Sequence, residues 1–270
     1  MTAVRRGSKR VTKAIIPAAG KGTRLLPLTR AIPKELVPLG RKPVLEHIVD
    51  ECIACGLEDI LFIISEEKTA IRDYFGSGTS SVRFTYAFQH EQRGLADAVY
   101  CGREFAGSDH FAIALGDSVI ESDQPVPPFR RVLDTYEQTG AAGVIVVQKA
   151  PPEEISRYGI VSPKSAIGPS FQIDALVEKP QLQDAPSDLA IAGRYAFDPA
   201  LFGYIEKTPK GANGEYQITD SIQLMLEDAM EIWSVPLTEG ETRRDIGTFE
   251  VYFEAFEREI EKEKASRKHE

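Results

Sequence analysis

Residues 15–39 read IIPAAGKGTRLLPLTRAIPKELVPL, and this stretch decides the fold. It begins as a short apolar run, turns at Gly20 and Gly22, and then supplies the positive charges of Arg24 and Lys34. Because glycine lacks a Cβ and tolerates positive φ, the backbone amides of such a turn can approach a polyanion closely. The stretch therefore predicts a strand followed by a loop that binds a phosphate-bearing ligand.

This loop differs from the two commonest phosphate loops. It lacks the G-x-x-x-x-G-K-[ST] spacing, and Leu25 occupies the place of the third glycine in the dinucleotide pattern G-x-G-x-x-G. A glycine turn alone is weak evidence, since tight turns use glycine for steric reasons. The joint pattern G-x-G-T-R followed by P-K-E is far more specific, and the missing glycine disfavours an oxidoreductase.

The composition is that of a folded globular protein. Of the 270 residues, 42% are hydrophobic and 27% are charged, which is ample material for a core. No apolar run approaches the roughly 20 residues of a membrane span, and the basic start, MTAVRRGSKR, has no apolar segment behind it. We therefore expect neither a membrane association nor a secretory signal.

Charge is spread unevenly along the chain. Residues 1–42 contain eleven Lys or Arg and one acid, Glu35, whereas the whole chain carries −9. The excess of bases after Lys13 fits a local anion site. An acidic chain overall argues against nucleic acid as a partner.

Three cysteines, Cys52, Cys55 and Cys101, argue against a disulfide framework and for a reducing, cytoplasmic compartment. Cys52 and Cys55 have the C-x-x-C spacing of redox and zinc sites. They lie in a predicted helix with no second Cys or His pair nearby, so we interpret them as packing residues. No G-x-S-x-G elbow is present, and nucleophilic catalysis has no visible agent.

Apolar runs alternate with helical patterns through the first half of the chain. We expect strands at residues 13–17, 59–65, 82–89, 110–115 and 143–148, and helices at 44–55, 68–75, 96–105 and 130–139. Continuous β-branched runs predict a mostly parallel sheet covered on both faces, and repeated βα units predict a doubly wound α/β fold.

After Pro151 the pattern changes to short strands and turns. We expect strands at residues 158–161, 172–178 and 194–197, and helices at 214–227 and 248–263. This part is interpreted as a smaller lobe of the mixed sheet that carries substrate-binding residues.

Polar residues follow the predicted strands at the edge where ligands bind in such folds. Gly20, Gln89 and Asp117 each come directly after a strand or at its end. Magnesium ions on phosphates use one or two carboxylates, and Asp245, before a glycine turn, is the candidate second acid. Alone, each aspartate is more typical of a turn or a helix cap.

A second group of candidates lies beyond the first 150 residues. Glu178 and Lys179 end another apolar run, where an acid and a base suit sugar hydroxyls and a phosphate; a solvated strand end is the alternative. Gly159 and Gly193 stand at strand boundaries, where a ligand can approach the backbone. Residues 215–220, EYQITD, fit the first turn of a helix with acids near the positive end of its dipole.

Together these segments resemble the bacterial sugar-1-phosphate nucleotidylyltransferases, most closely the UTP–glucose-1-phosphate uridylyltransferases, also called UDP-glucose pyrophosphorylases. The likeness runs from about Lys13 to Phe256 and rests on the ordered motifs AAGKGTRLLPLTRAIPKELVPL, QHEQRGLADAV, LGDS, YGIV, VEKP, AGRYAF, GEYQITDSI and DIGT. It implies a Rossmann-like fold and a Mg²⁺-dependent transferase that converts UTP and glucose 1-phosphate to UDP-glucose and pyrophosphate. It also implies a cytoplasmic homo-oligomer, either a dimer or a tetramer.

The resemblance implies a role for each matching residue. The catalytic cations would be Arg24 and Lys34, and the metal ligands Asp117 and Asp245. The nucleotide-binding residues would be Ala19, Gly20, Gly22, Thr23, Gln89 and Gly94. The residues facing the sugar and its phosphate would be Gly159, Glu178, Lys179 and Gly193.

These roles divide the chain into parts. We expect a single domain at residues 11–256, with a nucleotide-binding part to about 150 and a sugar-binding part at 151–247. A basic tail at 1–10 and a charged helix or tail at 257–270 would flank it.

Two alternatives stay open. The stretch between Phe75 and Gln89 is shorter than the helical insertion of the uridylyltransferases, and DIGT replaces their Asp-Cys-Gly-Ser or Asp-Cys-Gly-Asn. Both features are typical of thymidylyltransferases that use dTTP, whereas TRAIPKE, EYQITD and AGRY favour UTP. The alternative from another class is a non-catalytic nucleotide-sugar sensor, which should lack at least one of the two catalytic cations or two metal ligands; all four are present.

Overall fold

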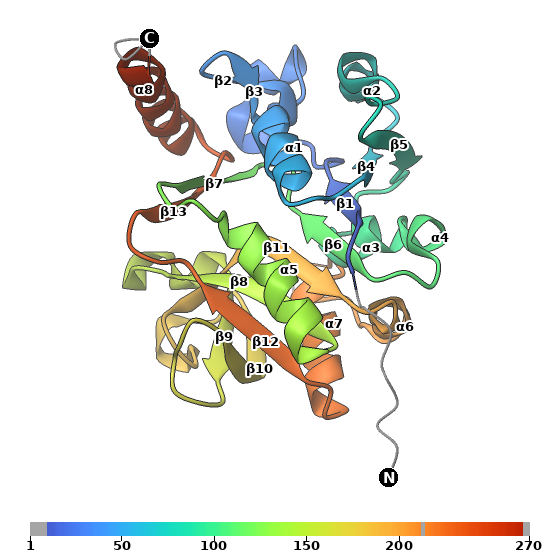
Figure 1. Cartoon of the computed structure of the whole chain (residues 1–270), viewed down its shortest axis with the longest axis vertical. Helices are drawn as coiled ribbons and strands as arrows, with labels where there is room; N and C mark the ends of the chain where they lie inside the picture. Colours follow the sequence, from blue (N-terminus) through green and yellow to red (C-terminus); the bar gives the residue numbers. More distant parts are fainter. Residues whose placement is uncertain (1–9, 212–213, 267–270) are drawn as a thin grey trace.

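The computed structural model describes residues 10–211 and 214–266. Their central element is a nine-stranded mixed sheet (Figure 1). Most of the predicted basic tail and the last four residues of the predicted charged tail lie outside the described residues. The strands of this sheet are β1 (Lys13–Pro17), β4 (Asp59–Ile64), β5 (Arg83–Phe88), β6 (Phe111–Ala114), β8 (Gly143–Lys149), β9 (Gly159–Pro163), β10 (Phe171–Glu178), β11 (Leu189–Phe197) and β12 (Ile232–Pro236). Their order in space is β5-β4-β1-β6-β11-β8-β12-β10-β9.

The two halves of the sheet are paired differently. Strands β5, β4, β1 and β6 are parallel, as continuous apolar sequences such as DILFII in β4 predict. Strand β11 runs antiparallel to both β6 and β8, and β10 runs antiparallel to β12 and β9. Strand β9 also pairs with β11, so the second half of the sheet curls back on itself. The predicted α/β fold with a mixed sheet is confirmed.

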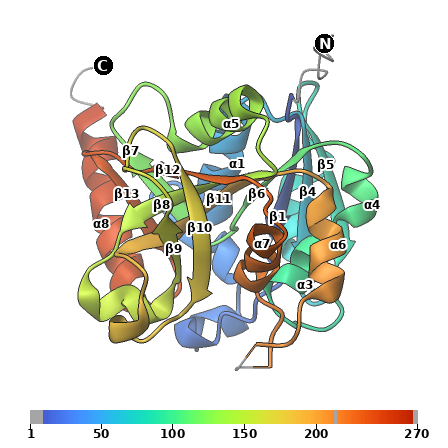
Figure 2. The same cartoon turned by 90° about the horizontal axis from the view of Figure 1, so that it is seen from below.

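Helices cover both faces of the sheet (Figure 2). They are α1 (Val44–Ala54), α2 (Thr69–Phe75), α3 (Leu95–Tyr100), α4 (Arg103–Ala106), α5 (Pro128–Thr139), α6 (Ala200–Lys207), α7 (Ile218–Glu227) and α8 (Phe249–Ser266). Adjacent residues of β1 point to opposite faces. Ile16 belongs to a core with residues of α1 and α5, and Ile15 to a second core with residues of α3, α6 and α7.

The last helix lies beside the sheet rather than over its centre (Figure 1). Helix α8 packs against β13 (Glu241–Asp245) and the small β2–β3 hairpin, Pro38–Leu39 and Lys42–Pro43. The Arg41 amide donates to the Glu263 carboxylate at 3.0 Å. No helix in the described parts of the chain has the length and apolar character that crossing a membrane requires.

Some elements differ from the sequence-based expectation. The helix expected at 96–105 divides into α3 and α4 at Gly102, where a Cβ would lie 2.4 Å from Ile15 Cδ1. The helix expected at 214–227 begins only at Ile218, because Tyr216 instead donates its amide to Arg93 O at 2.7 Å. A polar two-stranded ribbon of β7 (Ser118–Ser122) and β13 was not predicted, and neither were α6 and β12.

One glycine of the sheet makes room for an aromatic ring. Gly143 of β8 pairs with Phe197 of β11, and a Cβ at Gly143 would lie 2.2 Å from Phe197 Cε1. Gly143→Ala should therefore lower the free energy of unfolding by about 1–3 kcal/mol through overpacking. Gly203→Ala is the control, since no atom lies within 4 Å of its Cβ position in α6, and it should raise stability by about 0.5–1 kcal/mol. Urea unfolding measures both, and equal stability of Gly143→Ala and wild type would contradict this packing.

Candidate active site

The site begins where β1 and β6 end side by side. The Gly116 amide donates to Pro17 O at 3.2 Å, and a Cβ at Gly116 would lie 2.8 Å from that oxygen. Only glycine allows this approach, so the loop after β1 and the acid after β6 come together. The predicted convergence of Gly20 and Asp117 at one sheet edge is what the structure shows.

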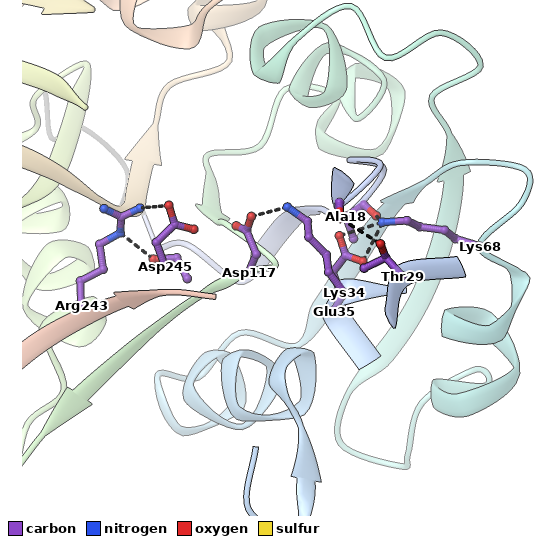
Figure 3. Close-up of polar contacts among 10 residues, drawn as sticks. Ala18, Thr29, Lys34, Glu35, Lys68, Asp117, Arg243 and Asp245 are labelled. Carbon is purple, nitrogen blue, oxygen red and sulfur yellow. Dashed lines mark hydrogen bonds and ion pairs between the residues drawn. The ribbon is translucent and has the colours of Figure 1, made fainter. Parts of the chain in front are cut away.

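Lys34 connects these two loops (Figure 3). It starts a short 3₁₀ turn, Lys34–Leu36, and its ammonium group forms a hydrogen-bonded ion pair with the Asp117 carboxylate. A Cβ placed on Gly20 would lie 3.5 Å from Lys34 Nζ. Burial opposes the charge on Lys34, but the neighbouring carboxylates of Asp117 and Glu35 raise its pKa above the ordinary value. The ammonium group is therefore a fixed cation beside the glycine loop.

The polar ribbon carries the second acid to the same place. In the β7–β13 pairing Asp245 lies opposite Ser118, and the Ile246 amide donates to Asp117 O at 2.8 Å. Burial and the charge of Asp117 raise the pKa of Asp245 above its ordinary value. Burial alone would raise the pKa of Asp117 as well, but Lys34 holds it below the ordinary value. Two neighbouring carboxylates thus differ in their electrostatic compensation.

The two aspartates fit a magnesium site of the kind that is completed by substrate. Across the described ranges 10–211 and 214–266, no group of three or more His, Cys, Asp or Glu side chains forms a metal cluster. Mg²⁺ bound to phosphates typically takes one or two carboxylates and fills its octahedron with phosphate oxygens and water. The two neighbouring carboxylates provide the electrostatic attraction for such a cation.

Arg24 lies against the glycine turn that follows Asp245. A Cβ at Gly247 would be 2.7 Å from Arg24 Nη2. Arg24 and Asp245 both line a cleft of about 1200 Å³, and Glu178 and Lys179 line the same cleft. Arg24 of the N-terminal loop and the predicted sugar residues Glu178 and Lys179 therefore face one cavity.

The predicted sugar residues of this cleft are held by contacts between β9, β10 and α7. Glu178 accepts a hydrogen bond from Thr219 Oγ1 at 2.8 Å and pairs with Lys179 Nζ at 3.0 Å. Lys179 has a φ of 47°, a strained value for a non-glycine residue. A Cβ at Gly159 would lie 2.5 Å from Thr219 Cγ2. The position therefore requires glycine, and Gly159 is a buried residue of the cleft lining.

Gly193 packs against the segment after β6 that carries Asp117, and it is not one of the residues that line the cleft. Its φ is 80°, its carbonyl accepts the Leu115 amide at 3.0 Å, and a Cβ would lie 3.1 Å from Ser118 Oγ. The fully buried Arg194 donates to the same carbonyl at 3.1 Å and pairs with Glu51 at 2.6 Å. Gly193 thus packs tightly against the segment that carries Asp117.

The residues predicted to bind the nucleotide are not among those that line this cleft. Ala19 lines a second cavity of about 480 Å³ together with His90 and Gln92. The Gln89 amide nitrogen donates to Gly94 O at 3.1 Å and to the Asp97 carboxylate at 2.7 Å.

The turn that contains Gly22 and Thr23 is held from within. Gly22 has a φ of 66°, and its carbonyl accepts Thr29 Oγ1 at 2.9 Å. Thr23 begins the 3₁₀ turn Thr23–Leu25 that directs Arg24 toward the cleft.

Three charged residues of the site had no role assigned from the sequence. Arg243 donates to Ser118 Oγ at 2.9 Å and lies 3.4 Å from the Asp245 carboxylate. Its position two residues before Asp245 on one strand places it on the same face, a signal that could have identified it. Glu35 and Lys68 form a buried ion pair beside Ala18 (Figure 3). The S-E-E-K context of Lys68 is typical of a solvated turn.

Comparison with known proteins identifies relatives over most of the chain. The family model described as nucleotidyl transferase matches residues 13–262. The UTP–glucose-1-phosphate uridylyltransferase of Bacillus subtilis is 41% identical over 241 residues, covering 81% of this chain and 82% of that protein. UTP–glucose-1-phosphate uridylyltransferase 1 of Staphylococcus saprophyticus is 40% identical over 261 residues, covering 88% of each. The crystal structure of a UDP-glucose pyrophosphorylase complexed with UDP-glucose has a TM-score of 0.87 at 30% identity, covering 93% of this chain and 99% of its own.

The different compensation of the two aspartates predicts stability changes of opposite sign. The raised pKa of Asp245 means that its ionised form costs stability at neutral pH, so Asp245→Asn should raise the free energy of unfolding. The lowered pKa of Asp117 means that its ionised form adds stability above the unfolded-state pKa, so Asp117→Asn should lower it by about 1–3 kcal/mol. Denaturant titration at pH 7 with a chelator measures both changes.

The pH dependence checks the same assignment. The advantage of Asp245→Asn should shrink as the pH falls toward the unfolded-state pKa, because the wild-type carboxyl is then protonated as well. The deficit of Asp117→Asn should also shrink at acid pH, where the wild type loses its ion pair. Changes of the same sign at neutral pH would contradict the assignment.

Proposed function

This chain belongs to the nucleotidyl transferase family, and we propose that it transfers a uridylyl group from UTP to glucose 1-phosphate, forming UDP-glucose and releasing pyrophosphate. The observation that carries the proposal is the cleft that Arg24, Asp245, Glu178 and Lys179 line together. Such a cleft suits two phosphate-bearing substrates that meet at their phosphates. The named uridylyltransferase relatives support UTP and glucose 1-phosphate as this pair.

In this reaction the protein has to position the two substrates and neutralise the charge of their phosphates. A phosphate oxygen of the sugar attacks the α-phosphorus in line, and negative charge grows on the departing pyrophosphate. Arg24 and Lys34 would bind the triphosphate and stabilise that charge as preorganised cations. The amides and small residues of the loop would bring the nucleotide close, and these residues are Ala19, Gly20, Gly22 and Thr23.

Asp117 and Asp245 would hold Mg²⁺ between them. When bound, the ion neutralises phosphate charge and helps align the reacting groups. Lys34 would then exchange its contact with Asp117 for contacts with the phosphates. Arg243 would keep Asp245 oriented through their ion pair.

In the same cleft, Glu178 would accept hydrogen bonds from sugar hydroxyl groups. Its orientation is fixed by Thr219. Lys179 would bind the phosphate of the sugar, since its side chain lies at the mouth of the cleft and is 46% exposed. Gly159, which lines the cleft, would face the sugar ring. Gly193 would act indirectly, by supporting the segment that carries Asp117.

Gln89 would read the base through its carbonyl oxygen. Both N–H groups of its amide are already used by Gly94 O and Asp97, so the oxygen is the group available to a ligand. A hydrogen-bond acceptor suits the N3–H of uracil and repels N3 of cytosine, which is itself an acceptor. Thymine presents the same N3–H, so this contact does not separate UTP from dTTP. Gly94 would support the base from the same loop.

Three further expectations stay predictions. They are a cytoplasmic location, assembly into a dimer or tetramer, and a division of the domain near residue 150 into nucleotide-binding and sugar-binding parts. Size-exclusion chromatography with light scattering would determine the oligomeric state.

A pyrophosphate-release assay tests the reaction and the base contact together. UTP, dTTP, CTP, ATP and GTP are each combined with several sugar 1-phosphates. We expect turnover with UTP and glucose 1-phosphate, and a kcat/KM for CTP at least about 100-fold lower because of the mismatched acceptor. No turnover with any pair would contradict the enzyme assignment. A clear preference for dTTP would contradict only the uridylyl assignment.

The metal assignment predicts that Asp117→Ala and Asp245→Ala each lose most of the Mg²⁺-dependent rate. We expect kcat to fall by about 100-fold or more, the usual effect of removing an electrostatic stabiliser. Asp123→Asn is the matched control, because Asp123 is an exposed acid. Initial rates are measured over a range of Mg²⁺ concentrations. Either alanine variant retaining wild-type rates would remove that residue from the proposed metal site.

A further inference from the structure

Lys68 is a buried cation beside the nucleotide loop, and its ammonium group is fully engaged. Lys68 Nζ donates to Glu35 Oε1 at 2.8 Å, to Glu35 Oε2 at 2.6 Å and to Ala18 O at 2.8 Å. An ammonium group has three N–H donors, so all three are directed to protein atoms. Although Lys68 lines the second cavity, it has no donor left for a phosphate.

The two partners of Lys68 belong to the two segments that carry the proposed triphosphate contacts. Ala18 directly precedes Ala19 and Gly20, and its own amide donates to Ile63 O of β4 at 2.7 Å. Glu35 follows Lys34 in the same 3₁₀ turn and is 1% exposed. One ammonium group therefore sets the distance between the start of the glycine loop and the turn that presents Lys34 (Figure 3).

We propose that Lys68 and Glu35 form a positioning pair for the nucleotide, which aligns the loop amides with the Lys34 ammonium group without either member touching the substrate. The inference rests on the proposed function, because it assigns the triphosphate to this loop. It predicts a selective effect on the nucleotide, since the contacts of the pair lie on the nucleotide side of the site. The proposed sugar residues are held elsewhere: Glu178 by Thr219 of α7, and Lys179 by Tyr158 O, directly before β9.

A purely structural role is the competing explanation. Burial lowers the pKa of Lys68 and raises that of Glu35, so removing one partner leaves a charge in a poor environment and destabilises the protein. Replacing both partners by neutral side chains of similar volume removes this penalty. The double variant Lys68→Met/Glu35→Gln therefore separates stability from positioning, because Ala18 O loses its donor while no buried charge is left alone.

The matched control is Lys13, at the opposite end of β1. Lys13 Nζ also makes three contacts, with Phe105 O at 2.8 Å, Ala106 O at 3.3 Å and the Asp109 carboxylate at 2.7 Å. It joins segments in the same manner but away from the glycine loop. Lys13→Met should therefore leave both Michaelis constants within twofold of wild type.

The test measures KM for UTP and for glucose 1-phosphate, the dissociation constant of UTP by calorimetry, and Tm. For the double variant we expect KM and Kd for UTP to rise about 10- to 100-fold, the usual cost of a misplaced contact. The KM for glucose 1-phosphate should stay within twofold. An unchanged KM for UTP, or an equal rise in both Michaelis constants, would overturn the inference.

Two further outcomes are distinguishable. If the double variant does not fold, Lys68→Arg replaces it, because a guanidinium can keep the ion pair but cannot direct three N–H groups from one nitrogen to these atoms. An unchanged KM for UTP in Lys68→Arg would then overturn the inference. If the wild type itself does not turn over UTP with glucose 1-phosphate, the proposed function fails. If the wild type is active and the variants keep its KM for UTP, only the positioning role fails.

Discussion

Two half-buried carboxylates that repel each other set the main constraint on this structure. Asp117 and Asp245 lie at one sheet edge because the Ile246 amide bonds to Asp117 O and the β7–β13 ribbon fixes their register. Charges of opposite sign continue the row on both sides, with Arg243 beyond Asp245 and Lys34 beyond Asp117 (Figure 3). The surrounding fold supplies the free energy that holds like charges together, which is typical of a site shaped for a cation and its anionic ligands.

Much of the fold and part of the site could be predicted from the sequence. The apolar run DILFII and its neighbours predicted the parallel half of the sheet, because strands buried on both faces need uninterrupted apolar side chains. The positions of Gly20 and Asp117 directly after such runs predicted that both residues lie at the same edge of the sheet. The end of a strand is a local feature of the sequence. Because adjacent parallel strands such as β1 and β6 end at the same edge of the sheet, the residues that follow them lie close together.

The remaining features depend on contacts between distant segments. The ribbon SVIES–ETRRD has no apolar run to mark it, and its strands are stabilised by pairing with each other. Arg194 lies in an apolar strand and gives no sign that its guanidinium is fully buried against Glu51 from α1. Lys68 is also separated from Glu35 by 33 positions. Such charges look solvated in a sequence, and only the tertiary structure shows that they are internal.

The contact between Gly94 and Tyr216 has a consequence for the evolution of specificity. Gly94 has a φ of 117°, and a Cβ at this position would lie 2.4 Å from Tyr216 O. The Tyr216 amide donates to Arg93 O, and the Ala96 amide donates to Tyr216 O. Tyr216 leads directly into α7, whose Thr219 orients Glu178. The loop proposed to read the base therefore packs against the segment that orients Glu178, the acid proposed to bind the sugar. Grafting a new loop to change the nucleotide preference would therefore disturb the sugar site as well. New pairs of nucleotide and sugar phosphate should arise by coordinated replacement of both segments.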